Sequence, residues 1–159
     1  MKKVQNMSRY VFHVSSPQNR LSILKNGLVA KKKQNRSNGI YAHNDFEPKF
    51  MWYPMFFDAW LQTDDEFHKF LSYFDYWRID THAIENIWYE DLTMKRDAAT
   101  LCFIPKNFYV FTKENIPIEH IELYKFQAEE VIIKLNILGA ASMEFKPQFR
   151  PYDINIYLK

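Results

Sequence analysis

Aromatic residues are unusually frequent in this sequence, and glycines are scarce. Phe, Tyr and Trp make up 18% of the 159 residues, whereas the chain has only 3 Gly. Large rings bury much apolar area, and few glycines leave few positions that adopt a positive φ without strain. We therefore expect a compact globular protein with few flexible loops. This length suits one core, so residues 1–159 are predicted to form a single domain.

Charge and cysteine content argue against several classes of protein. The 21 Lys and Arg nearly balance 19 Asp and Glu, so charge alone does not predict nucleic-acid binding. Cys102 is the single cysteine, which excludes an intrachain disulfide and a multi-cysteine zinc site. The five histidines lack metal-ligand spacing, and we predict no metal site. Neither a secretory signal nor an apolar run of membrane-spanning length is visible, so we expect a cytoplasmic protein without a membrane partner.

Hydrophobic patterning predicts an α+β fold. Helices are expected at 17–26, at 47–62 with a kink or break at Pro54, and at 64–74. Residues 85–98 are mixed in character and predict neither a helix nor a strand. Short strands rich in β-branched and aromatic residues are expected at 10–14, 39–42, 76–84, 100–104, 108–112 and 121–126, with further candidates at 131–133 and 154–158.

Three features are candidates for chemistry, each with an ordinary structural alternative. His13 and Ser15 share one face of the first strand, although a lone histidine is more often structural. Tyr41 on the second strand can offer a flat stacking surface, or can simply pack. The polar run from Lys31 to Asn38 contains Lys33 and Arg36, which suit a diphosphate but also suit a solvated loop.

Taken in order, these segments resemble the ADP-ribosyltransferase fold of the poly(ADP-ribose) polymerase and diphtheria-toxin type. The first strand reads Phe12-His13-Val14-Ser15-Ser16, and the helix ends Ile23-Leu24-Lys25-Asn26-Gly27-Leu28. The second strand reads Gly39-Ile40-Tyr41-Ala42. The resemblance covers residues 9 to about 46, and it implies split mixed or antiparallel sheets with flanking helices.

A later stretch fits the same family more loosely. The resemblance puts the family's catalytic glutamate at Asn107, at the start of the strand Phe108–Phe111. Asparagine can hydrogen-bond a ribose hydroxyl but supplies no charge to an oxocarbenium-like ribosyl cation. Glu114 and Glu119 are possible substitutes if the register differs. The family also often has Gly after the histidine, where this chain has Val14.

The resemblance implies a mono-ADP-ribosyltransferase that uses NAD as its substrate and modifies a protein or a nucleic acid. In this reading His13 bonds the nicotinamide-side ribose, Ser15 or Ser16 supports the pocket, and Tyr41 stacks on nicotinamide. The loop with Lys33 and Arg36 covers the diphosphate. Two alternatives stay open: a catalytically degenerate domain that binds a nucleotide or partner, and a structural or interaction protein whose surplus aromatic residues form an exposed patch.

Overall fold

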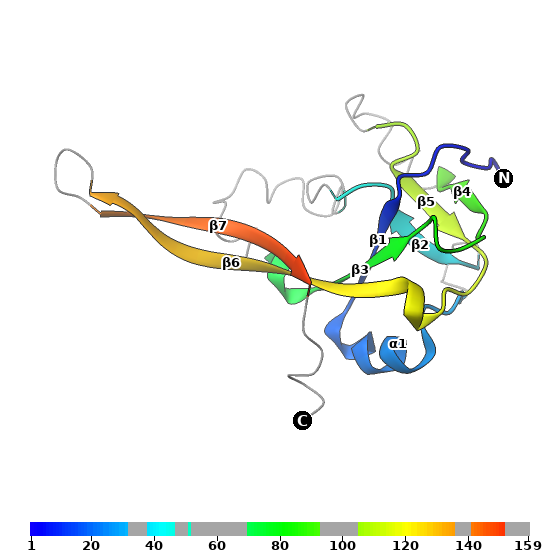
Figure 1. Ribbon diagram of the computed structural model, residues 1–159. Coiled ribbons are helices and arrows are strands. Elements are labelled where there is room, and N and C mark those ends of the chain that lie inside the picture. The colour runs from blue at the N-terminus through cyan, green and yellow to red at the C-terminus, as the bar shows by residue number, and fades with distance from the viewer. Residues whose placement is uncertain (32–37, 47–50, 52–69, 93–104, 136–140, 152–159) are drawn as a thin grey trace.

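The structure is a computed structural model in which one antiparallel sheet organises the chain (Figure 1). It describes residues 1–31, 38–46, 51, 70–92, 105–135 and 141–151, the last two ranges as backbone alone from residue 126 onward. Seven strands in these ranges form a sheet in the order β4-β5-β2-β1-β3-β6-β7. The strands are β1 (Tyr10–Ser15), β2 (Ile40–His43), β3 (Asp75–Asp80), β4 (Trp88–Glu90), β5 (Tyr109–Thr112), β6 (Ile121–Leu135) and β7 (Ala141–Pro151).

Helices in the described ranges are short and lie beside the sheet. The 3₁₀ turn η1 (Pro17–Asn19) leads directly into α1 (Arg20–Asn26), and a second turn, η3 (Ile118–His120), precedes β6. Ser16 caps η1, since its hydroxyl accepts a hydrogen bond from the amide of Gln18. The α+β class predicted from the sequence is confirmed by this mixture of sheet and flanking helical segments, but the described strands form one antiparallel sheet rather than the split sheets that the resemblance implies.

Most predicted strands and the first helix are confirmed, with changed lengths. The strand expected at 76–84 ends at Asp80, because residues 81–83 turn and Ala83 donates its amide to the Asp80 carbonyl. The strand expected at 121–126 continues to Leu135 and includes the separate candidate at 131–133. β4 and β7 had no sequence prediction. The predicted strands at 100–104 and 154–158, and most of the predicted helices at 47–62 and 64–74, lie outside the described residues.

Two apolar clusters lie on opposite faces of the sheet, as strand alternation requires. The cluster on the side of α1 combines helix residues with inward residues of every strand from β1 to β6: Val11, Ile23, Leu28, Ile40, Ala42, Trp77, Ile79, Trp88, Val110, Ile116 and Leu123. The cluster on the other face is mostly aromatic: Phe12, Met51, Leu71, Tyr76, Phe108, Tyr109 and Tyr124.

The hairpin formed by β6 and β7 projects well beyond the rest of the sheet (Figure 1). Its register runs from Tyr124 opposite Pro151 to Leu135 opposite Ala141, with an irregularity between Ile132 and Lys134. Only the first part of β6 pairs with the body of the sheet, where Ile121 to Tyr124 face β3.

A buried ionic cluster anchors the base of this hairpin. The carboxylate of Asp75, at the start of β3, is fully buried and accepts two hydrogen bonds of 2.7 Å from the Arg20 guanidinium of α1. Lys125 Nζ on β6 lies 3.2 Å from the same carboxylate and donates to the Phe74 carbonyl at 2.7 Å. One carboxylate therefore ties α1, β3 and β6 together.

Candidate functional site

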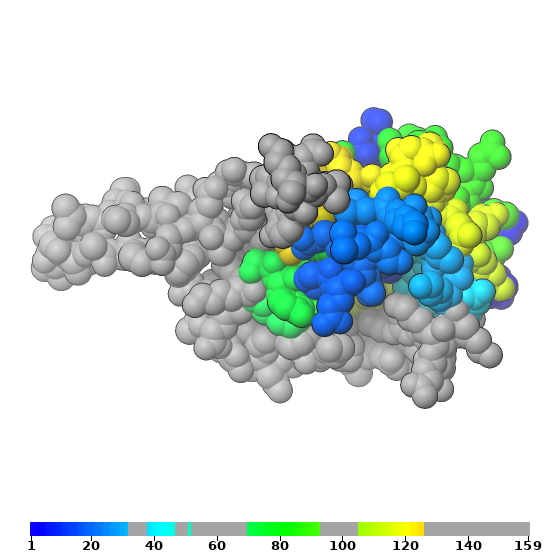
Figure 2. Space-filling model, turned by 90° about the horizontal axis from the view of Figure 1, so that it is seen from below, coloured from blue at the N-terminus to red at the C-terminus, as the bar shows by residue number. Residues whose placement is uncertain are grey.

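A pocket of about 370 Å³ opens where β1 ends, between α1 and the start of β2. Its lining combines polar groups from β1, η1 and α1 with backbone from the following turn and from β2: His13, Val14, Ser15, Ser16, Asn19, Ser22, Ile23, Gly27, Leu28, Val29, Lys31, Gly39 and Ile40. We call this the His13 pocket. Figure 2 shows η1 and α1 in blue on the surface of this side of the molecule, next to the yellow segment that includes η3.

Close backbone contacts give the His13 pocket its shape. Gly27 ends α1 with a φ of 71°, and a Cβ there would lie 2.3 Å from the Ile116 carbonyl oxygen. Leu28 and Ile116 exchange backbone hydrogen bonds of 2.9 Å in both directions, which fixes the turn against the chain that follows β5. Only glycine fits this crowded position with its positive φ. This steric requirement explains why the helix ends at Gly27, as the sequence predicts.

His13 is oriented by the neighbouring strand. Its Nδ1 lies 2.7 Å from the carbonyl oxygen of Tyr41. Because a carbonyl only accepts, Nδ1 carries the proton and donates, and in the neutral ring Nε2 is then the acceptor. The imidazole is half-buried, so its orientation is fixed while it still lines the pocket.

Ser15 is held from behind by a tryptophan. Trp77 Nε1 donates to Ser15 Oγ at 2.9 Å, and both side chains are buried. The Ser15 hydroxyl keeps its own proton as a donor, because it accepts from the indole. Ser15 therefore joins the wall of the His13 pocket to the core.

Tyr41 lies beside His13 through its backbone, but its ring is on the other face of the sheet. Phe12 pairs with His43, so one step along the register puts His13 opposite Ala42 and Val14 opposite Tyr41. The ring of Tyr41 stacks on Phe111, with centroids 5.3 Å apart and planes at 24°. The prediction that His13 and Tyr41 contact NAD in one site is therefore corrected: strand alternation separates the two rings, and Tyr41 is not part of the pocket lining.

Asn107 also lies away from the His13 pocket. It occupies the turn before β5, where Phe108 donates its amide to the Pro105 carbonyl, and its φ is 62°. Asparagine tolerates this left-handed conformation better than most residues, which gives Asn107 a structural reason of its own. The His13 pocket borders the first residue of β2, Ile40. Tyr109 pairs with the last residue of β2, His43, so Asn107 lies beyond the far end of that strand.

The two glutamates considered as substitutes are engaged elsewhere. Glu114 accepts a hydrogen bond of 2.8 Å from the amide of Ile87 through Oε2. Glu119 lies on η3 and lines a different pocket. Among the described residues that line the His13 pocket there is no carboxylate.

Of the predicted basic loop, the structure describes only its ends. Lys31 is exposed, lines the His13 pocket and pairs with Gly39 in an isolated bridge. Lys33 and Arg36 lie outside the described residues. Lys31 is thus the basic side chain that the described part of the chain brings to this pocket.

Sequence reasoning missed two polar residues of the pocket, Asn19 and Ser22. They lie three positions apart, which places them on one side of a helix, next to the apolar residues that the helix buries. Because a helix was predicted at 17–26, this spacing could have indicated that Asn19 and Ser22 face the same site. Buried Glu90 and Asp91, at the end of β4, were also missed, because residues 85–98 gave no pattern.

Comparisons with known proteins do not assign the chain to a family. No protein-family model, curated protein or solved structure matches it. Within the part of the chain that the structure describes, no three His, Cys, Asp or Glu side chains are grouped to hold a metal ion. In the same described residues, no helix is long and apolar enough to cross a membrane.

Proposed function

We propose that this protein is an ADP-ribosyltransferase-like domain that binds NAD in the His13 pocket and transfers a single ADP-ribose to a protein or nucleic acid. The observation that carries the proposal is the convergence of His13, Ser15 and Ser16 with Lys31 in one pocket. His13, Ser15 and Ser16 follow one another at the end of β1, and the family resemblance had selected these three; Lys31 joins them from the segment after α1.

The chemistry of the lining suits a nucleotide. Serine and asparagine side chains offer donors and acceptors for ribose hydroxyls or an adenine edge, and Lys31 offers a cation for a phosphate. A volume of about 370 Å³ is within the range of small-molecule sites. His13, with Nδ1 donating to the Tyr41 carbonyl, has at Nε2 an acceptor for a hydrogen bond from a ribose hydroxyl.

A second candidate function is favoured by the composition of the described pocket lining. A transferase of this type needs negative charge beside the ribosyl cation, and the described lining of the His13 pocket contains no carboxylate. The alternative is therefore a catalytically degenerate domain of the same fold that binds a nucleotide without transferring it. In both versions NAD occupies the same pocket.

Two measurements on the same variants test the proposal and separate its versions. Nicotinamide release from labelled NAD reports the reaction, and calorimetric titration with NAD reports binding. We expect His13→Ala to abolish both signals and His82→Ala, an exposed histidine outside the pocket, to change neither. NAD binding that depends on His13 without nicotinamide release would leave only the degenerate domain. Absence of NAD binding to the wild-type protein would overturn both versions.

A further inference from the structure

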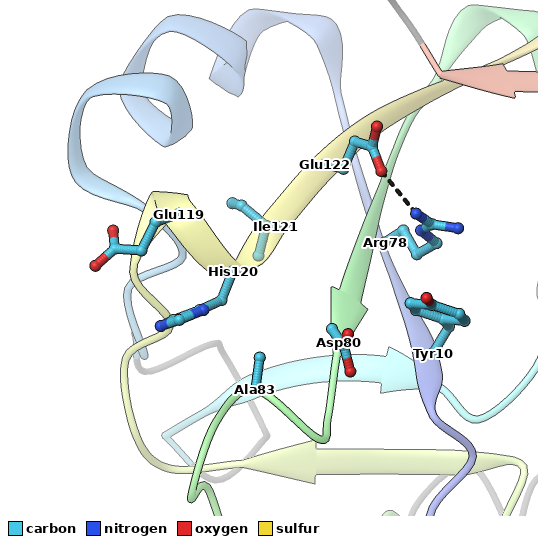
Figure 3. Close-up of a pocket in the computed structure, with 8 residues that line it drawn as sticks. All are labelled: Tyr10, Arg78, Asp80, Ala83, Glu119, His120, Ile121 and Glu122. Atoms are coloured by element: carbon cyan, nitrogen blue, oxygen red, sulfur yellow. Dashed lines mark hydrogen bonds and ion pairs between the residues drawn. The ribbon is translucent and has the colours of Figure 1, made fainter.

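A second pocket, of about 360 Å³, lies where β1 begins, β3 ends and β6 begins (Figure 3). It shares no lining residue with the His13 pocket. Tyr10, Arg78, Asp80 and Glu122 line it from the three strands, and Glu119 and His120 of η3 add further ionisable groups. We call it the Tyr10 pocket. Binding of a ligand in the Tyr10 pocket does not require the proposed binding of NAD.

One wall of the Tyr10 pocket is an arginine fixed between two tyrosines. The Arg78 guanidinium carbon lies 4.2 Å from the centroid of the Tyr10 ring and 4.7 Å from that of Tyr124. Arg78 Nη2 donates to Glu122 Oε2 at 2.7 Å, drawn as a dashed line in Figure 3. Rings from the two flanking strands hold the guanidinium, and Glu122 offsets its charge.

Asp80 supplies the negative charge beside Tyr10. Its Oδ1 accepts from the His82 amide at 3.0 Å and its Oδ2 from Arg9 Nη2 at 3.4 Å. Partial burial raises the pKa of Asp80, but the His82 amide and Arg9 outweigh that effect and hold the pKa below its ordinary value. The carboxylate is therefore ionised at neutral pH, and carboxylates accept more hydrogen bonds than these two.

Arg9 shows what kind of group the Tyr10–Asp80 edge attracts. Its guanidinium carbon lies 5.1 Å from the Tyr10 centroid, and its contact with Asp80 is long. The Arg9 side chain remains 60% exposed. The chain thus puts a guanidinium of its own against this ring and this carboxylate, and holds it only weakly. Such a group is readily displaced by a better-placed cation.

We propose that the Tyr10 pocket binds a basic side chain of a protein partner, arginine more strongly than lysine. The cationic head lies between the Tyr10 ring and Asp80, and the aliphatic stem contacts Ala83. Arginine is favoured because its planar guanidinium stacks on a ring and bonds a carboxylate with two N–H groups.

Nuclear magnetic resonance with capped tripeptides tests this directly. The probes are Gly-Arg-Gly, Gly-Lys-Gly and Gly-citrulline-Gly, the last being the neutral isostere of arginine. The Ala83 and Ile121 amides report binding at the pocket itself. We expect their shifts to saturate with the arginine probe, to saturate at higher concentration with the lysine probe, and to stay unchanged with citrulline.

Three variants make the test specific. Asp80→Asn keeps an acceptor for the His82 amide but removes the charge, and should weaken the arginine probe about tenfold or more. Arg9→Ala removes the competing guanidinium and should tighten binding about twofold to fivefold. Glu85→Gln removes an exposed carboxylate outside the pocket and should change nothing. A purely structural Asp80 does not explain a gain in affinity in the Arg9 variant.

The proposal fails if the wild-type amides do not respond to arginine or lysine, or if citrulline binds as well as arginine. It also fails if Asp80→Asn and Glu85→Gln behave alike, or if loss of Arg9 weakens the probe. Since NAD is absent from the experiment, these outcomes leave the proposed function of the His13 pocket unaffected.

Discussion

The strand β3 begins with Asp75 and ends with Asp80, and the two carboxylates differ in burial and in how tightly their ion-pair partners hold them. Asp75 is fully buried and bound by Arg20 and Lys125, whereas the Asp80 side chain is 27% exposed and its ion pair with the largely exposed Arg9 is 3.4 Å long. A buried carboxylate that pairs with two cations is needed for stability, because removing its charge leaves those cations buried without a counter-charge. An exposed carboxylate with a long contact is available to a ligand. The same residue type thus serves stability at one end and recognition at the other.

The largest effect expected from this difference is on folding stability. Asp75→Asn leaves Arg20 and Lys125, both largely buried, without their counter-charge. We expect a loss of about 3–5 kcal/mol in the free energy of unfolding. Urea denaturation measures it. Asp80→Asn is the matched control and should change stability little, since Asn still accepts from the His82 amide. Equal losses in the two variants would contradict the distinction between the two ends.

A smaller loss is expected at Ser15, which pairs with Asp75 across β1 and β3. Ser15→Ala leaves the buried Trp77 indole N–H without its acceptor. The expected loss is about 1–3 kcal/mol, the cost of an unsatisfied buried donor. Ser22→Ala, an exposed serine of the same pocket, should leave the denaturation midpoint unchanged. If both variants unfold at the wild-type urea concentration, Ser15 is not tied to the core.

Local patterns in the sequence predicted those parts of the fold that depend on neighbouring residues. Ser16-Pro17 began the first helix and Gly27 ended it, because capping and a positive φ are properties of single positions. β4 was missed because three residues, Trp88 to Glu90, carry too little alternation to recognise. β7 contains Pro147 and Pro151, and prolines argue against a strand in a sequence. β7 pairs only with β6, at the sheet edge, which explains why the two prolines are tolerated.

The sequence predicted those residues of the candidate site that lie close together along the chain, but not the contacts that depend on how the strands pair. His13, Ser15 and Ser16 were singled out, and they line one pocket. The register of two paired strands decides which face of the sheet each side chain occupies. The pairing of Phe12 with His43, which puts the Tyr41 ring on the other face, could not be predicted from the sequence. The buried cluster of Arg20, Asp75 and Lys125 joins residues up to 105 positions apart in the sequence, so no local pattern could reveal it.

At the exposed end of β3, the pair of Arg78 and Glu122 should contribute little. Glu122 is half-exposed, and the tyrosine rings hold Arg78 whether or not Glu122 is charged. We expect Glu122→Gln to cost about 0.2–1 kcal/mol, as exposed ion pairs do. Thermal denaturation at low and high salt checks this, because only the charged pair is screened. A loss as large as that of Asp75→Asn would show that both ends of β3 are structural.

The smallest effect expected is a pH dependence that belongs to the buried end. Burial lowers the pKa of Lys125 below 10.5, although Asp75 opposes that shift. Between this lowered pKa and 10.5 the unfolded chain binds more protons than the folded one, so stability rises with pH in that window. Burial raises the pKa of Tyr124 above 10.0, which has the opposite effect at higher pH, so the measurement stays between about pH 8 and pH 10. The free energy of unfolding of the wild type minus that of Lys125→Met should increase toward the upper end of this range. If this difference in unfolding free energy stays constant or decreases with pH, burial does not disfavour the charged form of Lys125. The Asp75 end of β3 would then resemble the exposed Asp80 end.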